Sequence, residues 1–200
     1  MSAGVFDTER RGPHAADEVA PLSEAFHQRA RAIVGRYPEG RARSALLPLL
    51  YLAQGEHGFV SVQAMDAIAA LLGLTRAEVQ AVATFYTMFK RTKQGRWLVS
   101  VCTQPSCALA GGGDLFERVR GLDGDVVSVE EVECLCACDA APVFSVNYDN
   151  YERMSVDDAV ALVEVLAAGG DPPPAARGSA PLDFGAINRE MAGAVEGDER

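Results

Sequence analysis

The sequence has no apolar run of the roughly 18 residues that a helix needs to cross a bilayer. Its longest apolar-rich stretches, residues 45–53 and 159–168, are short and predict helices packed in a protein core. The first residues mix both charge signs and contain no apolar segment, which is not typical of a secretory signal. We therefore expect a cytoplasmic protein.

Positive charge is also scarce. The chain has 18 Lys and Arg against 28 Asp and Glu, a formal net charge of −10, whereas a nucleic-acid partner requires a basic face. The glycine-rich patterns that bind dinucleotides or nucleoside triphosphates are absent. Gly111–Gly113 is followed by Asp114, which would repel a phosphate. We expect no substrate-binding active site, and no NADH or flavin site, in this chain.

The 200 residues divide into four parts by composition and pattern. We predict a flexible N-terminal tail over 1–22, a helical domain over 23–93, an α/β domain over 94–169 and a Pro/Gly/Ala-rich C-terminal tail over 170–200.

Helix signals recur in the first domain. We predict one helix over Ser23–Tyr37, ended by Pro38, and a second that opens at Ser44. His57 lies near the end of that second helix, where the helix dipole favours a charged imidazolium. Ser61 is a candidate cap for a third helix, and Thr75 to Glu78 form a capping box for a fourth. Together these helices predict a small bundle.

The second domain alternates strand and helix patterns. Strands are expected at Trp97–Val101, Val126–Val132, Val143–Val146 and Tyr151–Met154, the last after a turn at 147–150. Helices are expected over 114–121 and after the cap Ser155. The fold class is therefore α/β (α+β), a helical bundle followed by helices against a small mixed sheet.

All five cysteines lie between Cys102 and Cys138. Cys102 and Cys107 form a C-x4-C pair after one strand, and Cys134 and Cys138 form a C-x3-C pair after the next. Two strand ends of one sheet can bring these four thiolates together. Four thiolates suit a [2Fe–2S] cluster, a [4Fe–4S] cluster or a structural zinc ion.

The spacing of the cysteines favours the [2Fe–2S] cluster over structural zinc. Structural zinc usually takes tighter C-x2-C knuckles, whereas a two-iron cluster needs two ligands on each iron and suits two separate pairs. Two other interpretations remain open, namely small buried hydrophobic residues and a dithiol redox site, although C-x-x-C is absent.

Four segments carry a resemblance to a known family: VCTQPSCALAGG (101–112), ECLCACDAAPVFSVNYDNYERM (133–154), YPEGRARSALLPLLYLAQGEHGFVS (37–61) and LGLTRAEVQAVATFYTMFKR (72–91). Over about residues 25–170 the chain resembles the thioredoxin-like [2Fe–2S] ferredoxin family of NADH-quinone oxidoreductase, in which it forms the 24 kDa subunit of respiratory complex I.

The resemblance implies a thioredoxin-like second domain that binds one [2Fe–2S] cluster, with Cys102 and Cys107 on one iron and Cys134 and Cys138 on the other. It also implies a partner subunit that carries FMN and binds NADH. The chain would then be an electron-transfer subunit of an oxidoreductase, in the peripheral arm of a membrane-bound complex. A thiolate-ligated cluster in an acidic chain leads us to expect a low reduction potential.

Cys136 departs from the family pattern, which generally has a glycine or another small residue there. It is either a small-residue replacement or a thiol that can substitute as a ligand or be oxidised. Three alternative functions also stay open: the equivalent diaphorase subunit of an NAD-linked hydrogenase or formate dehydrogenase, a free-standing ferredoxin-like carrier, and a zinc module without redox activity.

Overall fold

The computed structural model describes residues 19–178 and 180–193. Within them the chain forms two compact units, one made of residues up to 93 together with the segment from 188, the other of residues 94–187. The predicted tail over 1–22 lies mostly outside the described residues, as does the chain after 193. In the described part no helix is both long enough and apolar enough to span a membrane.

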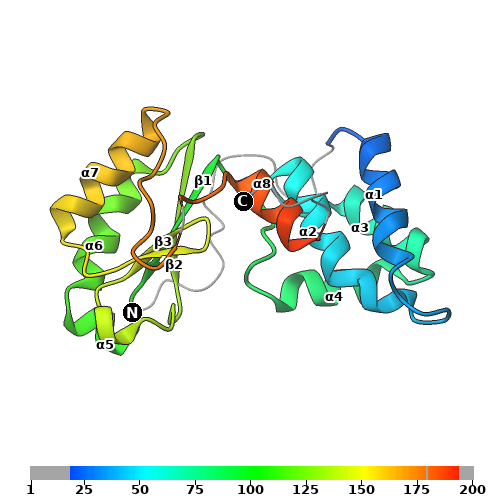
Figure 1. Cartoon of the computed structure of the whole chain (residues 1–200), viewed down its shortest axis with the longest axis horizontal. Helices are drawn as coiled ribbons and strands as arrows, with labels where there is room; N and C mark the ends of the chain where they lie inside the picture. Colours follow the sequence, from blue (N-terminus) through cyan, green and yellow to red (C-terminus); the bar gives the residue numbers. More distant parts are fainter. Residues whose placement is uncertain (1–18, 179, 194–200) are drawn as a thin grey trace. The chain divides into compact units, whose positions relative to one another are not determined.

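Up to residue 93 the helical unit contains four α-helices, labelled in Figure 1, and a short 3-10 turn. They are α1 (Glu24–Val34), η1 (Ala42–Ala45), α2 (Leu46–His57), α3 (Val62–Leu72) and α4 (Arg76–Phe85). One apolar core joins them, with Phe26, Leu49 and Ile68 fully or almost fully buried.

The predicted caps of this unit are confirmed. The hydroxyl of Ser61 accepts a hydrogen bond from the Ala64 amide at 3.1 Å. Thr75 and Glu78 make both hydrogen bonds of a capping box at the start of α4. Gly73 ends α3 in the left-handed conformation, with φ of 65°.

Two helix boundaries were predicted wrongly. Helix α1 ends at Val34 instead of Tyr37, because Gly35 follows it and glycine is a poor helix former. The second helix does not open at Ser44, which lies in the 3-10 turn; α2 begins at Leu46. Pro48 then falls in the first turn of α2, where its missing N–H leaves no hydrogen bond unmade.

The second unit is built on a four-stranded mixed sheet in the order β2-β1-β3-β4. Its strands are β1 (Trp97–Cys102), β2 (Val127–Val132), β3 (Phe144–Val146) and β4 (Asp149–Tyr151). Strands β1 and β2 run parallel, while β1–β3 and β3–β4 are antiparallel. This small mixed sheet with helices confirms the predicted fold class.

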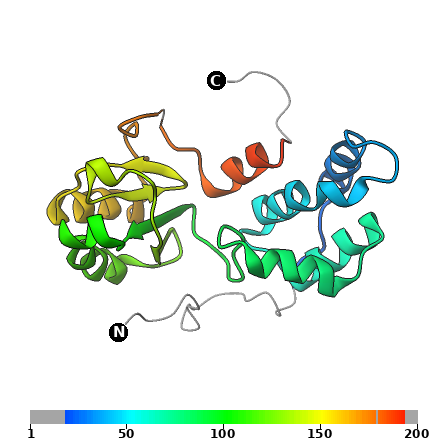
Figure 2. The ribbon, with the colours of Figure 1, turned by 90° about the horizontal axis from the view of Figure 1, so that it is seen from below.

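Helices occupy one face of this sheet. Helices α6 (Gly112–Val119) and α7 (Val156–Ala167) lie side by side in Figures 1 and 2, and both contact the sheet. Leu115 and Val163 point from them into a core shared with Val99 and Phe144. Short helices complete the unit: α5 (Pro105–Leu109), η2 (Arg120–Leu122) and η3 (Cys138–Ala140).

The fourth strand lies earlier than predicted. It spans Asp149–Tyr151 instead of Tyr151–Met154, because the hairpin turn needs only Asn147 and Tyr148. Both turn residues have positive φ, 47° and 78°, as a two-residue turn matched to the twist of the strands requires. The buried Asn147 side chain also accepts from the Leu98 amide at 2.7 Å.

One helix was not predicted. Helix α8 (Phe184–Met191) lies in the segment predicted as a Pro/Gly/Ala-rich tail. Its first residue, Phe184, belongs to the sheet-containing unit and is buried, and its amide donates to the Arg96 carbonyl at 2.9 Å. Asn188, assigned to the helical unit, is fully buried and accepts a 2.8 Å hydrogen bond from Gln54.

Candidate metal centre

The sheet brings both cysteine pairs to one edge. Cys102 is the last residue of β1 and is paired in register with Val132, the last residue of β2. Since carboxyl ends of parallel strands meet at the same edge, the loops that follow β1 and β2 emerge together. The βαβ crossover through α5 and α6 is therefore what places the C-x4-C and C-x3-C segments side by side.

Four thiols line one cavity of about 290 Å³ at this edge: those of Cys102, Cys107, Cys134 and Cys138, together with Gln104, Pro105 and Ser106. The sulfur atoms of Cys134 and Cys138 are 3.4 Å apart. All four predicted site residues are thus brought together. In the described residues, no three His, Cys, Asp or Glu side chains converge on one point as they would around a single metal ion.

The two pairs differ in exposure. Cys102 and Cys107 are 2% and 3% exposed and pack with Ala137 and Val143, whereas Cys134 and Cys138 are exposed. The first pair is anchored by the strand, since the Cys102 amide donates to the Val143 carbonyl at 3.2 Å. The second pair depends on its own loop and on what contacts that loop.

Gly112, the first residue of α6, closes the base of the first loop. A Cβ atom on Gly112 would lie 2.7 Å from the Cys102 carbonyl oxygen and 2.9 Å from that of Cys107. Both distances are shorter than real Cβ contacts, so only glycine allows α6 to begin this close to the two cysteines.

The thiols influence each other's protonation. Burial, followed by a hydrogen bond with the Cys102 thiol, raises the pKa of Cys107 to about 11. The backbone amide of Cys136, which donates to Cys134 Sγ at 3.4 Å, lowers the pKa of Cys134, and the neighbouring thiol Cys138 lowers it further. The hydrogen bond with Cys134 in turn raises the pKa of Cys138. Such coupling requires close thiols, the same proximity that shared ligation requires.

Cys136 lies apart from this cavity. It has φ of 60°, in the left-handed region that favours glycine, and it is one of the residues that line a second cavity of about 200 Å³, with Tyr148 and Arg177. Its backbone N–H nevertheless contacts Cys134 Sγ. Its Sγ also donates to the Cys134 carbonyl at 3.7 Å, so both the backbone and the thiol of Cys136 contact Cys134.

The donor set fits a two-iron cluster. Four cysteine sulfurs arranged as two pairs around one cavity match the ligand number and type of a [2Fe–2S] centre. Amide donors directed at sulfur, as at Cys136, are the outer contacts that adjust the potential of such a centre.

The sequence patterns missed the residues that support the second loop. Asn150 of β4 donates to the Leu135 carbonyl at 3.2 Å, and Arg177 pairs with Asp139 at 3.0 Å and with Glu152 at 2.6 Å. One signal was present, since Arg177 is the only Lys or Arg between Arg153 and Arg189. It was not sufficient, because nothing in the sequence places residue 177 next to residue 139.

A mixed α/β unit that presents four cysteine thiols at one sheet edge has the donor set of a cysteine-ligated metal protein. A model of the family described as thioredoxin-like [2Fe-2S] ferredoxin matches residues 30–167. The chain belongs to this family. The resemblance seen in the sequence is thereby confirmed, and the family supports a [2Fe–2S] cluster as the bound group.

The chain is also similar in sequence to named proteins of other organisms. The chain is 42% identical over 174 residues to a subunit of the NADH-quinone oxidoreductase of Mycobacterium tuberculosis, an alignment that covers 82% of the chain and 68% of that relative. It is 38% identical over 144 residues to the mitochondrial NADH dehydrogenase [ubiquinone] flavoprotein 2 of Dictyostelium discoideum, covering 67% of the chain and 58% of that relative.

A solved structure shares the fold. A crystal structure of NAD+-reducing [NiFe]-hydrogenase in the air-oxidized state aligns with a TM-score of 0.53. The alignment covers 61% of the present protein and 23% of the hydrogenase chain. At 22% identity, this likeness concerns the fold alone.

Proposed function

We propose that this protein is an electron-transfer subunit of an NADH-quinone oxidoreductase. One observation carries the proposal: four thiols from two strand ends line a single cavity in a chain that is 42% identical to a subunit of such a complex. Cys102 and Cys107 would hold one iron of a [2Fe–2S] cluster, and Cys134 and Cys138 the other. When bound, the cluster supplies one-electron redox chemistry.

The protein's own residues have three tasks at this site. The buried pair Cys102 and Cys107 forms the floor of the cavity and excludes water from one side. The exposed pair Cys134 and Cys138 leaves the other side near the surface, where an electron donor can approach. The Cys136 amide donates to a ligand sulfur and stabilises its negative charge.

The proposed electron donor is reduced flavin in a partner subunit that also binds NADH. The peripheral arm of a membrane-bound complex is the corresponding location. Two features support a separate flavin subunit: the sequence lacks a nucleotide-binding pattern, and relatives are named as parts of NADH-oxidising enzymes. Identity to the mycobacterial subunit favours complex I over a hydrogenase module, for which the likeness is one of fold.

The test combines metal analysis with electron transfer. We expect about two irons and two sulfides per chain after anaerobic reconstitution, and reduction of the cluster by NADH when the flavin-carrying subunit of the same complex is added. Zinc without iron would establish the non-redox alternative. A loaded cluster that NADH plus the flavin subunit leaves oxidised would refute the proposed donor.

A further inference from the structure

The segment that follows α7 contacts the hairpin formed by β3 and β4. We call residues 171–178 the C-terminal strap. Asp171 pairs with Arg96 at 2.7 Å, and the Pro173 carbonyl accepts a hydrogen bond from the Tyr151 hydroxyl. A tyrosine hydroxyl is protonated at neutral pH, and burial raises the pKa of Tyr151 further, to about 12. The strap is therefore an ordered part of this unit.

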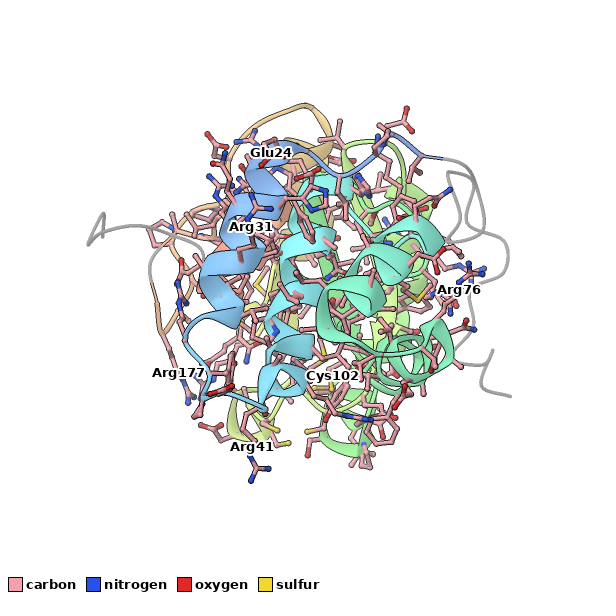
Figure 3. The ribbon with its side chains drawn as sticks, turned by 90° about the vertical axis from the view of Figure 1, so that its right-hand side faces the viewer. Glu24, Arg31, Arg41, Arg76, Cys102 and Arg177 are labelled. Atoms are coloured by element: carbon pink, nitrogen blue, oxygen red, sulfur yellow. The ribbon has the colours of Figure 1, made fainter. Side chains whose placement is uncertain are left out.

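Arg177 of the strap, labelled in Figure 3, bridges two carboxylates. One terminal nitrogen lies 3.0 Å from Asp139 Oδ2, while Nε lies 2.6 Å from Glu152 Oε1. The Glu152 side chain is only 9% exposed, so its charge depends on this partner more than a surface carboxylate would. A planar guanidinium has separate donors for both contacts, whereas an ammonium group is a single point charge.

These two carboxylates connect the strap to the second cysteine pair. Asp139 directly follows Cys138, and Glu152 directly follows β4. Arg153 adds a contact from the same side, because its amide donates to the Ala140 carbonyl at 2.8 Å.

We propose that Arg177 is a positioning residue for the cluster: it fixes the exposed Cys134–Cys138 loop against the hairpin and contributes a positive charge beside the anionic centre. This inference rests on the proposed function. The first cysteine pair is fixed by β1 and burial, so the strap acts on the pair that lacks such support.

The bridge affects the rate of iron release, whereas the charge of the removed side chain sets the sign of the change in reduction potential. Arg177→Gln removes the bridge and a positive charge, so iron is released to a chelator faster and the reduction potential becomes more negative. Asp139→Asn also removes the bridge to the loop but removes a negative charge, so release is again faster while the potential becomes more positive. Arg177→Lys keeps the charge, so its potential stays near wild type while release is intermediate.

The experiment uses the full-length reconstituted protein. Cluster loss to a chelator is followed optically, and the potential is measured by redox titration. We expect Arg177→Gln to lose iron about 10-fold faster, the lower end of what removing an outer contact costs a metal site. The matched control is Arg120→Gln, which removes an exposed arginine of the same unit from a single pair with Glu117. It should match the wild type in both measurements.

A second measurement follows the order of the Cys134–Cys138 loop in the protein without its cluster. In the apo-protein, hydrogen exchange of the amides in residues 134–140 should be faster in Arg177→Gln and unchanged in Arg120→Gln. Wild-type exchange, iron release and potential in Arg177→Gln would overturn this inference and leave the proposed function intact. A reconstituted wild type that binds no iron and sulfide would overturn the proposed function, and with it the inference.

Discussion

At the scale of single residues, Cys136 contributes through its backbone. Its φ is 60°, its amide donates to Cys134 Sγ at 3.4 Å, and its own Sγ donates to the Cys134 carbonyl at 3.7 Å. The left-handed conformation costs roughly 1–2 kcal/mol in residues other than glycine. The same amide contact with Cys134 would be made by a glycine without that cost.

Cys136→Gly should therefore retain the cluster, with unchanged iron and sulfide content. Its free energy of unfolding should be unchanged or higher by up to about 1 kcal/mol, since relief of the left-handed strain is partly offset by the flexibility of glycine in the unfolded chain. Cys136→Val is the control, because a β-branched residue adopts this φ poorly and should weaken cluster retention. Retention in Cys134→Ser together with loss in Cys136→Gly would contradict the ligand assignment.

Burial governs the titration of His57. Its position at the end of α2 suggested a stabilised imidazolium, but burial lowers its pKa below the ordinary 6.5, only partly opposed by the charge of Glu56. The unfolded chain binds this proton more readily than the folded one, so stability falls as the pH drops below about 6.5.

We expect the thermal midpoint of the wild type to decrease between pH 6.5 and 5, with His57 contributing to the slope. In His57→Gln the thermal midpoint should decrease less steeply over the same pH range. Above pH 7 the slopes of the two proteins should be more similar. Equal slopes in both proteins would exclude His57 as a contributor.

At the scale of elements, helix α6 begins against the first cysteine pair. Gly112 is confined by the Cys102 and Cys107 carbonyls, whereas a Cβ atom on the adjacent Gly113 would meet nothing within 4 Å. The two neighbouring glycines therefore form a matched pair for substitution.

Gly112→Ala should destabilise the protein by roughly 1–3 kcal/mol, the cost of overpacking, and should accelerate cluster loss because the displaced atoms belong to the ligand loop. Gly113→Ala should be neutral or stabilising by up to about 1 kcal/mol, since alanine is the better helix former. Chemical denaturation of both variants measures the difference. Equal effects at the two positions would show that the close approach of α6 is unimportant.

The elements also show what the sequence could predict. Local signals located the caps Ser61 and Thr75 and the strands that precede the cysteines, because side-chain caps and apolar patterns depend on near neighbours. The turn at 147–150 was predicted, but its restriction to Asn147 and Tyr148 was not, because a tyrosine with positive φ has no sequence signature. The pairing of Arg177 with Asp139 was missed because it joins residues 38 apart.

At the scale of the whole molecule, the C-terminal segment contributes to both units. Phe184 belongs to the unit of residues 94–187 and Asn188 to the helical unit, where it contacts Gln54, and both residues are buried. On the surface, ion pairs such as Glu24–Arg31 on α1 (Figure 3) are exposed at both ends and contribute little. The buried C-terminal contacts matter more.

A chain ended after Gly170 should be markedly less stable, because it loses the strap and the burial of Phe184, itself worth about 1.5–3 kcal/mol. Thermal unfolding measures the loss. A chain ended after Gly193 is the control, since it keeps every contact described above and should unfold near the wild-type midpoint. Identical midpoints for both truncations would show that the segment 171–193 is dispensable.

Electron paramagnetic resonance of the dithionite-reduced protein tests the central claim most directly. A [2Fe–2S] cluster held by Cys102, Cys107, Cys134 and Cys138 predicts a rhombic signal from one unpaired electron per chain, lost or altered in each Cys→Ser variant and kept in Cys136→Gly. No such signal from the reduced wild type, together with an absence of bound iron, would contradict the account.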